Sequence, residues 1–100
     1  MEVLKNMLAQ NPRDSFARYG LAMEHANQGE LEQAVTEYRA LLEYNPDYAA
    51  AYFHGGQALE KLRRVEDARD MYKKGIEITS RTGDQHTKSE LEAALEMLPI

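Results

Sequence analysis

The sequence predicts an all-α protein, an α-solenoid of about five helices in which antiparallel helix hairpins stack into a right-handed superhelix. The first observation is a repeat, because the dipeptide Asn11-Pro12 recurs 34 residues later as Asn45-Pro46. The second is that apolar residues recur with the helical period of about 3.6 residues. The third is that no segment alternates polar and apolar residues for long enough to predict a strand.

The repeat is supported by the kinds of residue that match when residues 11–44 are laid over residues 45–78. The matches include a helix breaker, small residues and an aromatic residue, which are the kinds of position that a helical hairpin repeat needs. Seven positions are identical: Asn11 and Asn45, Pro12 and Pro46, Ala17 and Ala51, Glu32 and Glu66, Ala34 and Ala68, Tyr38 and Tyr72, and Glu43 and Glu77. We therefore predict repeat 1 over residues 11–44 and repeat 2 over residues 45–78.

Each repeat divides into two helices. In repeat 1 the first is expected over about residues 14–28 and the second over about residues 31–44, from the apolar spacing in each segment. Gly29 separates them, and glycine suits the left-handed conformation that often ends a helix. Repeat 1 is therefore a helical hairpin, and repeat 2 should fold in the same way.

The boundaries of these helices carry their own signals. Asp14 and Asp47 follow the two prolines closely, so we expect each to accept backbone hydrogen bonds at a helix start. Repeat 2 has Arg63-Arg64 at the turn where repeat 1 has Gly29. Arginine tolerates several turn geometries that are not left-handed, so we expect one of those there, at a small cost in stability.

Half-repeats flank the two hairpins. Residues 1–10 are expected to form an N-terminal half-repeat helix, and residues 82–98 a C-terminal capping helix with Leu91, Ala94, Leu95 and Leu98 on its apolar side. Stacked repeats bury their faces only against neighbours, so an array of two repeats needs its ends covered. We therefore treat residues 1–100 as a single domain, and Pro99-Ile100 after an amphipathic helix favours a natural chain end there.

Composition excludes several classes of function. The net charge of -5 argues against a nucleic-acid binder, and the basic residues between Lys61 and Lys74 are interleaved with acidic ones. The sequence has no apolar run long enough to span a membrane and no signal peptide at its start, so we expect a cytoplasmic protein. It has no cysteine, which excludes disulfides, thiolate zinc sites and a cysteine nucleophile.

At this point the two units resemble the tetratricopeptide repeat (TPR) family over residues 11–78. Repeat 2 carries Tyr52, Gly55, Gly56 and Leu59 in its first helix and Ala68, Tyr72 and Gly75 in its second; repeat 1 carries Arg18, Leu21, Ala22 and His25, then Ala34, Tyr38 and Leu41. The pattern departs from the family at Arg18, His25, Gly55 and Ser80, the last standing where the family has proline. Two degenerate motifs in tandem at the correct period make the resemblance specific.

The adjacent glycines Gly55 and Gly56 fall in the middle of a predicted helix. Each glycine makes helix formation about 1 kcal/mol less favourable than alanine would, so the pair calls for an explanation. A close contact between helices is the favoured explanation, with Tyr72 filling the space beside the small residues. A ligand that approaches the backbone is the alternative.

The resemblance implies a function. TPR hairpins stack into a curved ladder whose inner surface is made by the first helix of each repeat, and that groove usually binds an extended peptide or a partner helix. Carried over to this chain, the inner-face residues are Phe16, Tyr19, Met23, Asn27, Phe53, Gln57, Lys61 and Leu91. Their apolar and aromatic character favours a non-enzymatic protein-interaction module. One alternative is that residues 1–9 or the end helix of the same chain cover this face. Another is that a second copy covers it, which would make the chain a homodimeric scaffold.

Catalysis and metal binding are less favoured. His25, His54 and His86 lie far apart in sequence, and we expect packing roles for His25 and His54. His86 and Glu90 would share a helix face, but they lack the further ligands that a metal site needs. We expect instead that Asp84 caps the last helix and that Glu90 pairs with His86 or Arg81. No cofactor is predicted, and the chain is not predicted to be an enzyme.

Overall fold

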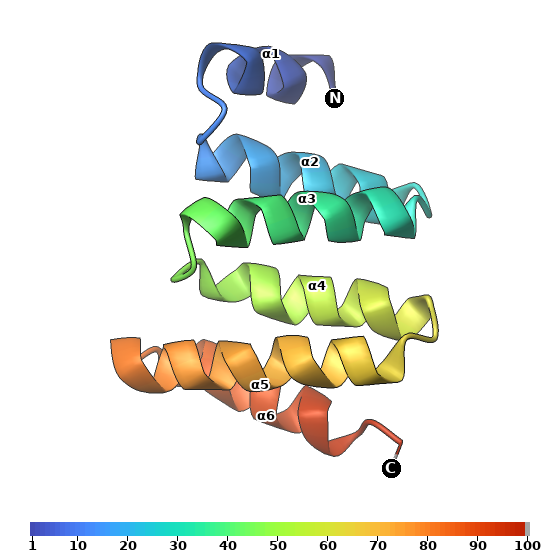
Figure 1. The fold of residues 1–100 in the computed structure, drawn as a ribbon, viewed down its shortest axis with the longest axis vertical. Coiled ribbons are helices and arrows are strands. Elements are labelled where there is room, and N and C mark those ends of the chain that lie inside the picture. Colours follow the sequence, from blue (N-terminus) through green and yellow to red (C-terminus); the bar gives the residue numbers. More distant parts are fainter. Residues whose placement is uncertain (100) are drawn as a thin grey trace.

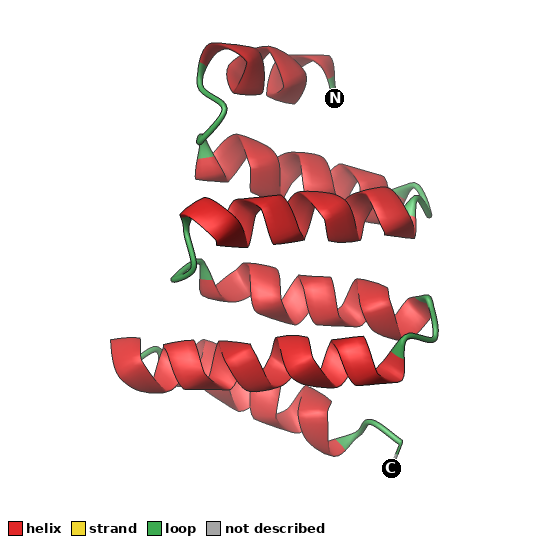
Figure 2. Ribbon diagram, viewed as in Figure 1, coloured by secondary structure: helices red, strands yellow, loops and turns green. Residues whose placement is uncertain are grey.

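The computed structural model describes residues 1–99, and Ile100, part of the expected chain end, lies outside the described residues. Residues 1–99 form six helices and no strand (Figures 1 and 2). They are α1 (Glu2–Gln10), α2 (Ser15–Asn27), α3 (Leu31–Tyr44), α4 (Ala49–Lys61), α5 (Val65–Thr82) and α6 (Gln85–Glu96). The prediction of an all-α stack of antiparallel hairpins is confirmed, with six helices in place of about five. Of these helices, none has both the length and the apolar character that crossing a bilayer requires.

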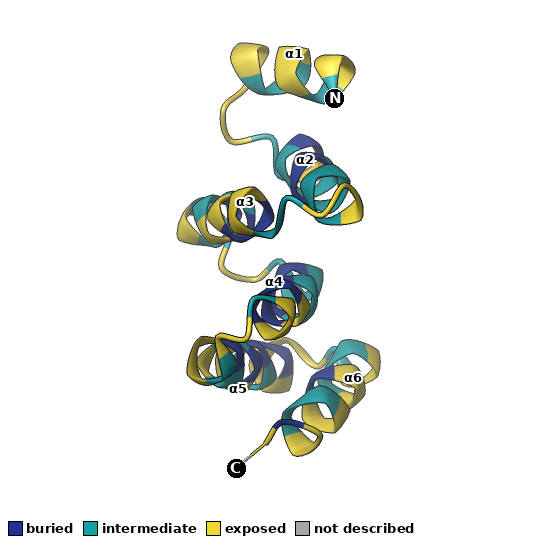
Figure 3. Cartoon of the chain, turned by 90° about the vertical axis from the view of Figure 1, so that its right-hand side faces the viewer, coloured by how far each residue is buried: buried dark blue, intermediate teal, exposed yellow. Residues whose placement is uncertain are grey.

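The helices lie in two layers, with α2, α4 and α6 in one and α3 and α5 in the other (Figure 3). Within the first layer α4 contacts both α2 and α6, so the first helices of successive repeats form a continuous surface. Helix α1 packs on α2 alone, where the Leu4 side chain approaches Gly20, and none of its residues is buried. The N-terminal helix therefore covers one end of the stack and leaves the α2/α4/α6 layer open.

Two of the three aspartates expected at helix starts are N-caps. The Asp14 carboxylate accepts from the Ala17 N–H at 3.0 Å, and the Asp84 carboxylate accepts from the Thr87 N–H at 3.1 Å. The expectation for Asp47 is wrong: α4 has Tyr48 at its N-cap, so Asp47 stands one residue outside the helix. Its carboxylate instead accepts from Arg81 at 2.6 Å, an exposed ion pair that ties the start of α4 to the end of α5.

The turn between α4 and α5 also differs from the expectation. Arg63 has φ of 63°, in the left-handed region, as Gly29 does with φ of 80°. The Arg64 N–H donates to the Leu59 carbonyl at 2.9 Å, just as the Glu30 N–H donates to the His25 carbonyl at 2.8 Å. Both repeats thus use the same helix-ending motif, and the hydrogen bonds hold arginine in a conformation that glycine adopts without cost.

Helix α5 runs four residues past the predicted end of repeat 2, to Thr82. Ser80 stands where the family has a helix-breaking proline, and serine leaves the backbone hydrogen bonds of the helix intact. The helix ends at Gly83, which has φ of 82°. The C-terminal helix consequently begins at Gln85, later than the predicted residue 82.

The core lies between the two layers, and the small residues set the distance between helices. A Cβ atom on Gly56 would lie 2.2 Å from Cε1 of Tyr72, whose ring is fully buried. A Cβ atom on Gly75 would lie 2.7 Å from Cβ of Tyr52, so α4 and α5 each present a glycine to a tyrosine of the other. The expected close contact between helices at the glycine pair is confirmed, most clearly at Gly56.

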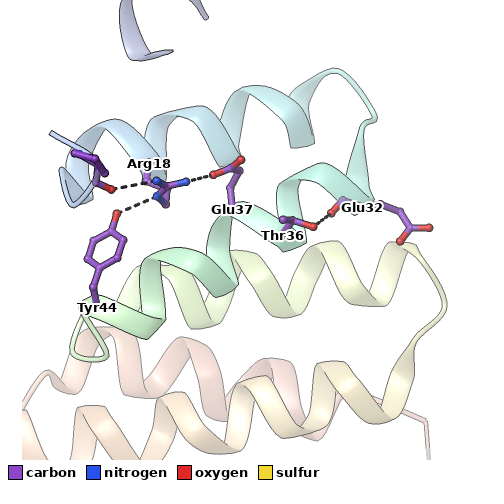
Figure 4. Close-up of polar contacts among 6 residues, drawn as sticks. Arg18, Glu32, Thr36, Glu37 and Tyr44 are labelled. Atoms are coloured by element: carbon purple, nitrogen blue, oxygen red, sulfur yellow. Dashed lines mark hydrogen bonds and ion pairs between the residues drawn. The ribbon is translucent and has the colours of Figure 1, made fainter. Parts of the chain in front are cut away.

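Arg18 occupies a position where the family pattern has a large residue and repeat 2 has Tyr52, and it joins α2 to α3 by polar contacts (Figure 4). Its guanidinium donates to the Glu37 carboxylate at 2.6 Å and to the Tyr44 hydroxyl at 3.1 Å. It also donates to the Pro12 carbonyl at 3.1 Å. These bonds replace the packing that an aromatic residue would supply at this position.

Candidate functional site

Two adjacent hollows open on the α2/α4/α6 layer. The α4/α6 hollow has a volume of about 440 Å³, and the α2/α4 hollow has a volume of about 220 Å³. The α4/α6 hollow is lined by Phe53, Gln57, Glu60, Tyr72, Glu90, Ala93, Ala94 and Met97. The α2/α4 hollow is lined by Met23, Ala26, Asn27, Leu31, Tyr38, His54, Gln57, Ala58 and Lys61. Because Gln57 lines both hollows, they form one surface, which we call the inner groove.

The hollows share a common plan, with a buried tyrosine from the other layer at the base of each. Tyr38 of α3 lines the α2/α4 hollow, and Tyr72 of α5 lines the α4/α6 hollow. The Tyr38 hydroxyl donates to the Met23 sulfur at 2.9 Å, and the Tyr72 hydroxyl donates to the Glu60 carboxylate. Burial raises the pKa of both hydroxyls, so they stay protonated near neutral pH and act as fixed hydrogen-bond donors.

Aromatic rings connect the two hollows along α2 and α4. The Tyr19 ring lies 5.2 Å from the Tyr48 ring and 5.9 Å from the His54 ring, measured between centroids. The Phe53 ring meets His54 edge-on at 5.2 Å. Burial lowers the pKa of His54, against an opposing effect of Glu90, so the imidazole is neutral at pH 7 and packs as an aromatic ring. The predicted packing role of His54 fits this environment.

The charges differ between the hollows. Among the residues that line the α4/α6 hollow, the charged ones are Glu60 and Glu90, both carboxylates. The α2/α4 hollow carries Lys61 and Asn27 and has no carboxylate in its lining. Glu90 lies 3.8 Å from His86 at the exposed surface of α6, the weak pairing that the sequence predicted. The α4/α6 hollow is therefore largely apolar with two acidic groups, whereas the α2/α4 hollow mixes polar and apolar surface and carries one cation, Lys61 of α4.

The inner-face residues predicted from the sequence differ in position and in exposure. Five of them line the hollows: Met23, Asn27, Phe53, Gln57 and Lys61. Phe16 is 69% exposed but lies outside both hollows, and Tyr19 is half-buried in the aromatic cluster. The placement of Leu91 on the inner face is wrong, because its side chain is fully buried. The missing side chain of Gly75 leaves the space that Leu91 fills, with its Cδ1 atom 2.8 Å from where a Cβ would stand.

Sequence reasoning missed several groove residues, namely Ala26, Glu60, Glu90, Ala93, Ala94 and Met97. The repeat contained the signal for three of them, because Ala26, Glu60 and Ala94 are spaced 34 residues apart and all line the groove. The signal was hidden by residue type: an alanine looks like packing, and Glu60 looks like part of a solvated charged face. Met97 follows the end of α6, and its equivalents in the repeats, Arg63 and Gly29, line neither hollow.

The histidines do not assemble a site in the part of the chain that the structure describes. No group of three or more histidine, aspartate or glutamate residues within residues 1–99 lies close enough to hold a metal ion. His25 instead bonds through Nδ1 to the Glu30 carboxylate at 2.8 Å and joins the end of α2 to the start of α3. The His25 side chain is largely buried, which fits the predicted packing role, and its pairing with Glu30 adds a polar contact that the sequence did not predict.

Comparison with known proteins identifies the class. The model of the tetratricopeptide repeat family matches residues 19–81, more than half of the sequence, and the chain belongs to this family. TPR repeat-containing protein PA0015 of Pseudomonas aeruginosa is 26% identical over 98 residues, which cover 98% of this chain and 93% of that protein. Uncharacterized protein MJ0572 of Methanocaldococcus jannaschii is 33% identical over 60 residues, covering 60% of this chain and 70% of that protein.

Solved structures share the fold. A tetratricopeptide repeat domain protein from Salinibacter ruber matches with a TM-score of 0.79 and 40% identity, covering 85% of this chain and 86% of that one. Protein BPP2914 from Bordetella parapertussis matches with a TM-score of 0.82 and 28% identity, covering 95% and 83%. YrrB, described as a TPR protein with an unusual peptide-binding site, matches with a TM-score of 0.71 and 23% identity, covering 93% and 48%.

Proposed function

We propose that this chain is a non-enzymatic protein-interaction module that binds a peptide or a partner helix along the inner groove. The observation that carries the proposal is the continuity of two open hollows across α2, α4 and α6, joined at Gln57: the α4/α6 hollow is largely apolar, and the α2/α4 hollow is part polar and part apolar. An apolar surface with a few fixed polar groups is the usual character of a recognition site. Membership of the TPR family, whose members generally mediate protein interactions, supports the same conclusion.

The groove is also preorganised. Tyr72 is held by the close approach of Gly56 and by its hydrogen bond to Glu60, and Tyr38 is held by Met23. A partner that binds against fixed rings loses less free energy to ordering the receptor than one that binds a mobile surface. YrrB, which shares the fold, has a peptide-binding site of its own, so the architecture is compatible with this use.

The proposal is tested by selecting binders from a phage-displayed library of randomised short peptides on the immobilised protein. Selected peptides are then measured by fluorescence anisotropy against the wild type and two matched variants. Gln57→Tyr puts a bulky side chain where the hollows meet, and Lys73→Tyr puts the same side chain on the exposed surface of α5, in the other layer. We expect Gln57→Tyr to weaken binding about tenfold or more, equivalent to about 1.4 kcal/mol, while Lys73→Tyr leaves it unchanged. Equal effects of the two variants, or no selected binder, would contradict the proposal.

Self-association through the same layer is the second candidate. Met97 is 85% exposed at the rim of the α4/α6 hollow, and a second copy could bury it together with Phe53. Light scattering distinguishes the two candidates. A tight dimer that becomes a folded monomer in the Phe53→Ala, Met97→Ala double variant supports self-association, and a wild-type monomer at micromolar concentration removes it.

A further inference from the structure

The α4/α6 hollow combines an apolar lining with two carboxylates. Phe53 and Tyr72 contribute rings, Ala93 leaves space, and the Met97 side chain stands 85% exposed at the rim. Methionine is flexible and polarisable, and it adapts its shape to the apolar group that covers it. The hollow is therefore shaped to receive a large apolar side chain and to close over it with Met97.

The two carboxylates come from different helices, Glu60 from α4 and Glu90 from α6. One Glu60 oxygen accepts from the Tyr72 hydroxyl, which fixes the carboxylate at the hollow. Glu90 is paired at 3.8 Å with the exposed His86, a contact that costs little to break. Both carboxylates line the same hollow, so a basic group that enters it meets negative charge from α4 and from α6.

We propose that the α4/α6 hollow recognises a segment of a partner protein in which a large apolar side chain stands next to lysine or arginine. The apolar side chain occupies the space beside Phe53 and Tyr72, and the basic group pairs with Glu60 and Glu90. The inference rests on the proposed function, and it assigns to one end of the inner groove a preference for basic over acidic partners. The formal net charge of -5 acts in the same direction at longer range.

The neighbouring hollow gives an internal contrast. The lining of the α2/α4 hollow includes Lys61 and Asn27 and no carboxylate, so its charged group repels a basic side chain. The preference for a cation therefore belongs to the α6 end alone. A partner that spans both hollows should place its basic residue over α6 and a neutral or acidic residue over the end of α2.

The test uses the same phage-displayed library of randomised short peptides on three proteins: the wild type, Glu90→Lys and Glu92→Lys. Glu92 is exposed on the same helix and does not line the hollow, so it controls for the change in net charge. We expect wild-type selections to be enriched in lysine or arginine beside leucine, methionine or phenylalanine. Affinity of a selected basic peptide should fall about fivefold or more with Glu90→Lys, and by less than about twofold with Glu92→Lys. Raising the salt concentration should weaken the wild-type complex.

The outcomes separate this inference from the proposed function. Selected peptides that lose affinity with Gln57→Tyr but contain no excess of basic residues, or an excess of acidic ones, overturn the inference and leave the proposed function standing. Equal losses with Glu90→Lys and Glu92→Lys show an effect of net charge alone and also overturn it. If the wild type selects no peptide from the library at all, both the inference and the proposed function are overturned.

Discussion

Replacing Gly56 with alanine should destabilise the protein, whereas the same change at its neighbour Gly55 should not. The new Cβ at Gly56 would stand 2.2 Å from Cε1 of Tyr72, far inside van der Waals contact, so the buried ring would have to leave its packed position. At Gly55 the nearest atom is the terminal methyl of Met71 at 3.3 Å, which can move aside.

The comparison isolates the packing cost. Alanine gains about 1 kcal/mol of helix propensity over glycine at either position, so this gain cancels between the two variants. Overpacking a dense core costs about 1–3 kcal/mol, and the contact at Gly56 belongs at the upper end. We therefore expect Gly56→Ala to be less stable than Gly55→Ala by about 2–3 kcal/mol, and Gly55→Ala to equal or exceed the wild type.

Urea unfolding followed by circular dichroism measures both variants, and thermal unfolding should show a difference of about 4–8 °C for each kcal/mol in a domain of this size. Equal stability of the two variants would refute the account of the glycines as spacers between α4 and α5. Because Tyr72 lines the α4/α6 hollow, Gly56→Ala should also lower the affinity of the protein for the selected peptides.

Three further predictions concern single residues. Arg63→Gly should stabilise the protein by about 0.5–1 kcal/mol, because glycine avoids the left-handed penalty of about 1–2 kcal/mol but loses more backbone entropy on folding; a lower urea midpoint would contradict this. Arg18→Ala should lower the free energy of unfolding in urea by about 1.5–3 kcal/mol, since it removes the charge-assisted hydrogen bond that Arg18 donates to Glu37, with both side chains only 20% exposed; a loss below about 0.5 kcal/mol would show that the network contributes little. His54 binds protons less readily in the folded protein than in the unfolded chain, because burial lowers its pKa. Stability should therefore fall as pH decreases below about 6.5, and His54→Phe should remove that part of the pH dependence; identical pH profiles of wild type and variant would contradict it.

The helices could be predicted from the sequence because the signals that start and end them are local. Asp14 and Asp84 act as N-caps through hydrogen bonds within three residues, and Gly29 ends α2 as its chemistry suggests. Arg63 shows where local reasoning fails. Its own preference argues against a left-handed backbone, but it is equivalent to Gly29 in the repeat, and the hydrogen bonds of the turn decide its conformation.

The groove was predictable only in part, because its depth depends on contacts between helices. The repeat register placed Gln57 and Leu91 at equivalent positions, yet Gln57 is exposed and Leu91 is buried. A second pair of equivalent positions explains this difference. Repeat 1 has Leu41 where repeat 2 has Gly75, and the space beside Gly75 is filled by Leu91. Such compensation between repeats is not visible in either repeat alone.

The acidic character of the α4/α6 hollow was also hidden from sequence reasoning. Glu60 and Glu90 lie 30 residues apart in the chain, and each falls in a charged helix surface when read alone. They line one hollow because α4 and α6 pack side by side in the same layer. Only the packing of two helices from different repeat units brings these two carboxylates together.

The central claim, that a partner segment binds in the inner groove, is tested most directly by chemical-shift mapping. A ¹⁵N-labelled sample of the whole chain is titrated with a selected peptide, and the perturbed amides are assigned. We predict that the perturbations cluster on α2, α4 and α6, around Gln57, Glu90 and Ala93, and spare the exposed surface of α5 around Lys73. Perturbations centred on α3 and α5, with the amides around Gln57 unmoved, would contradict it.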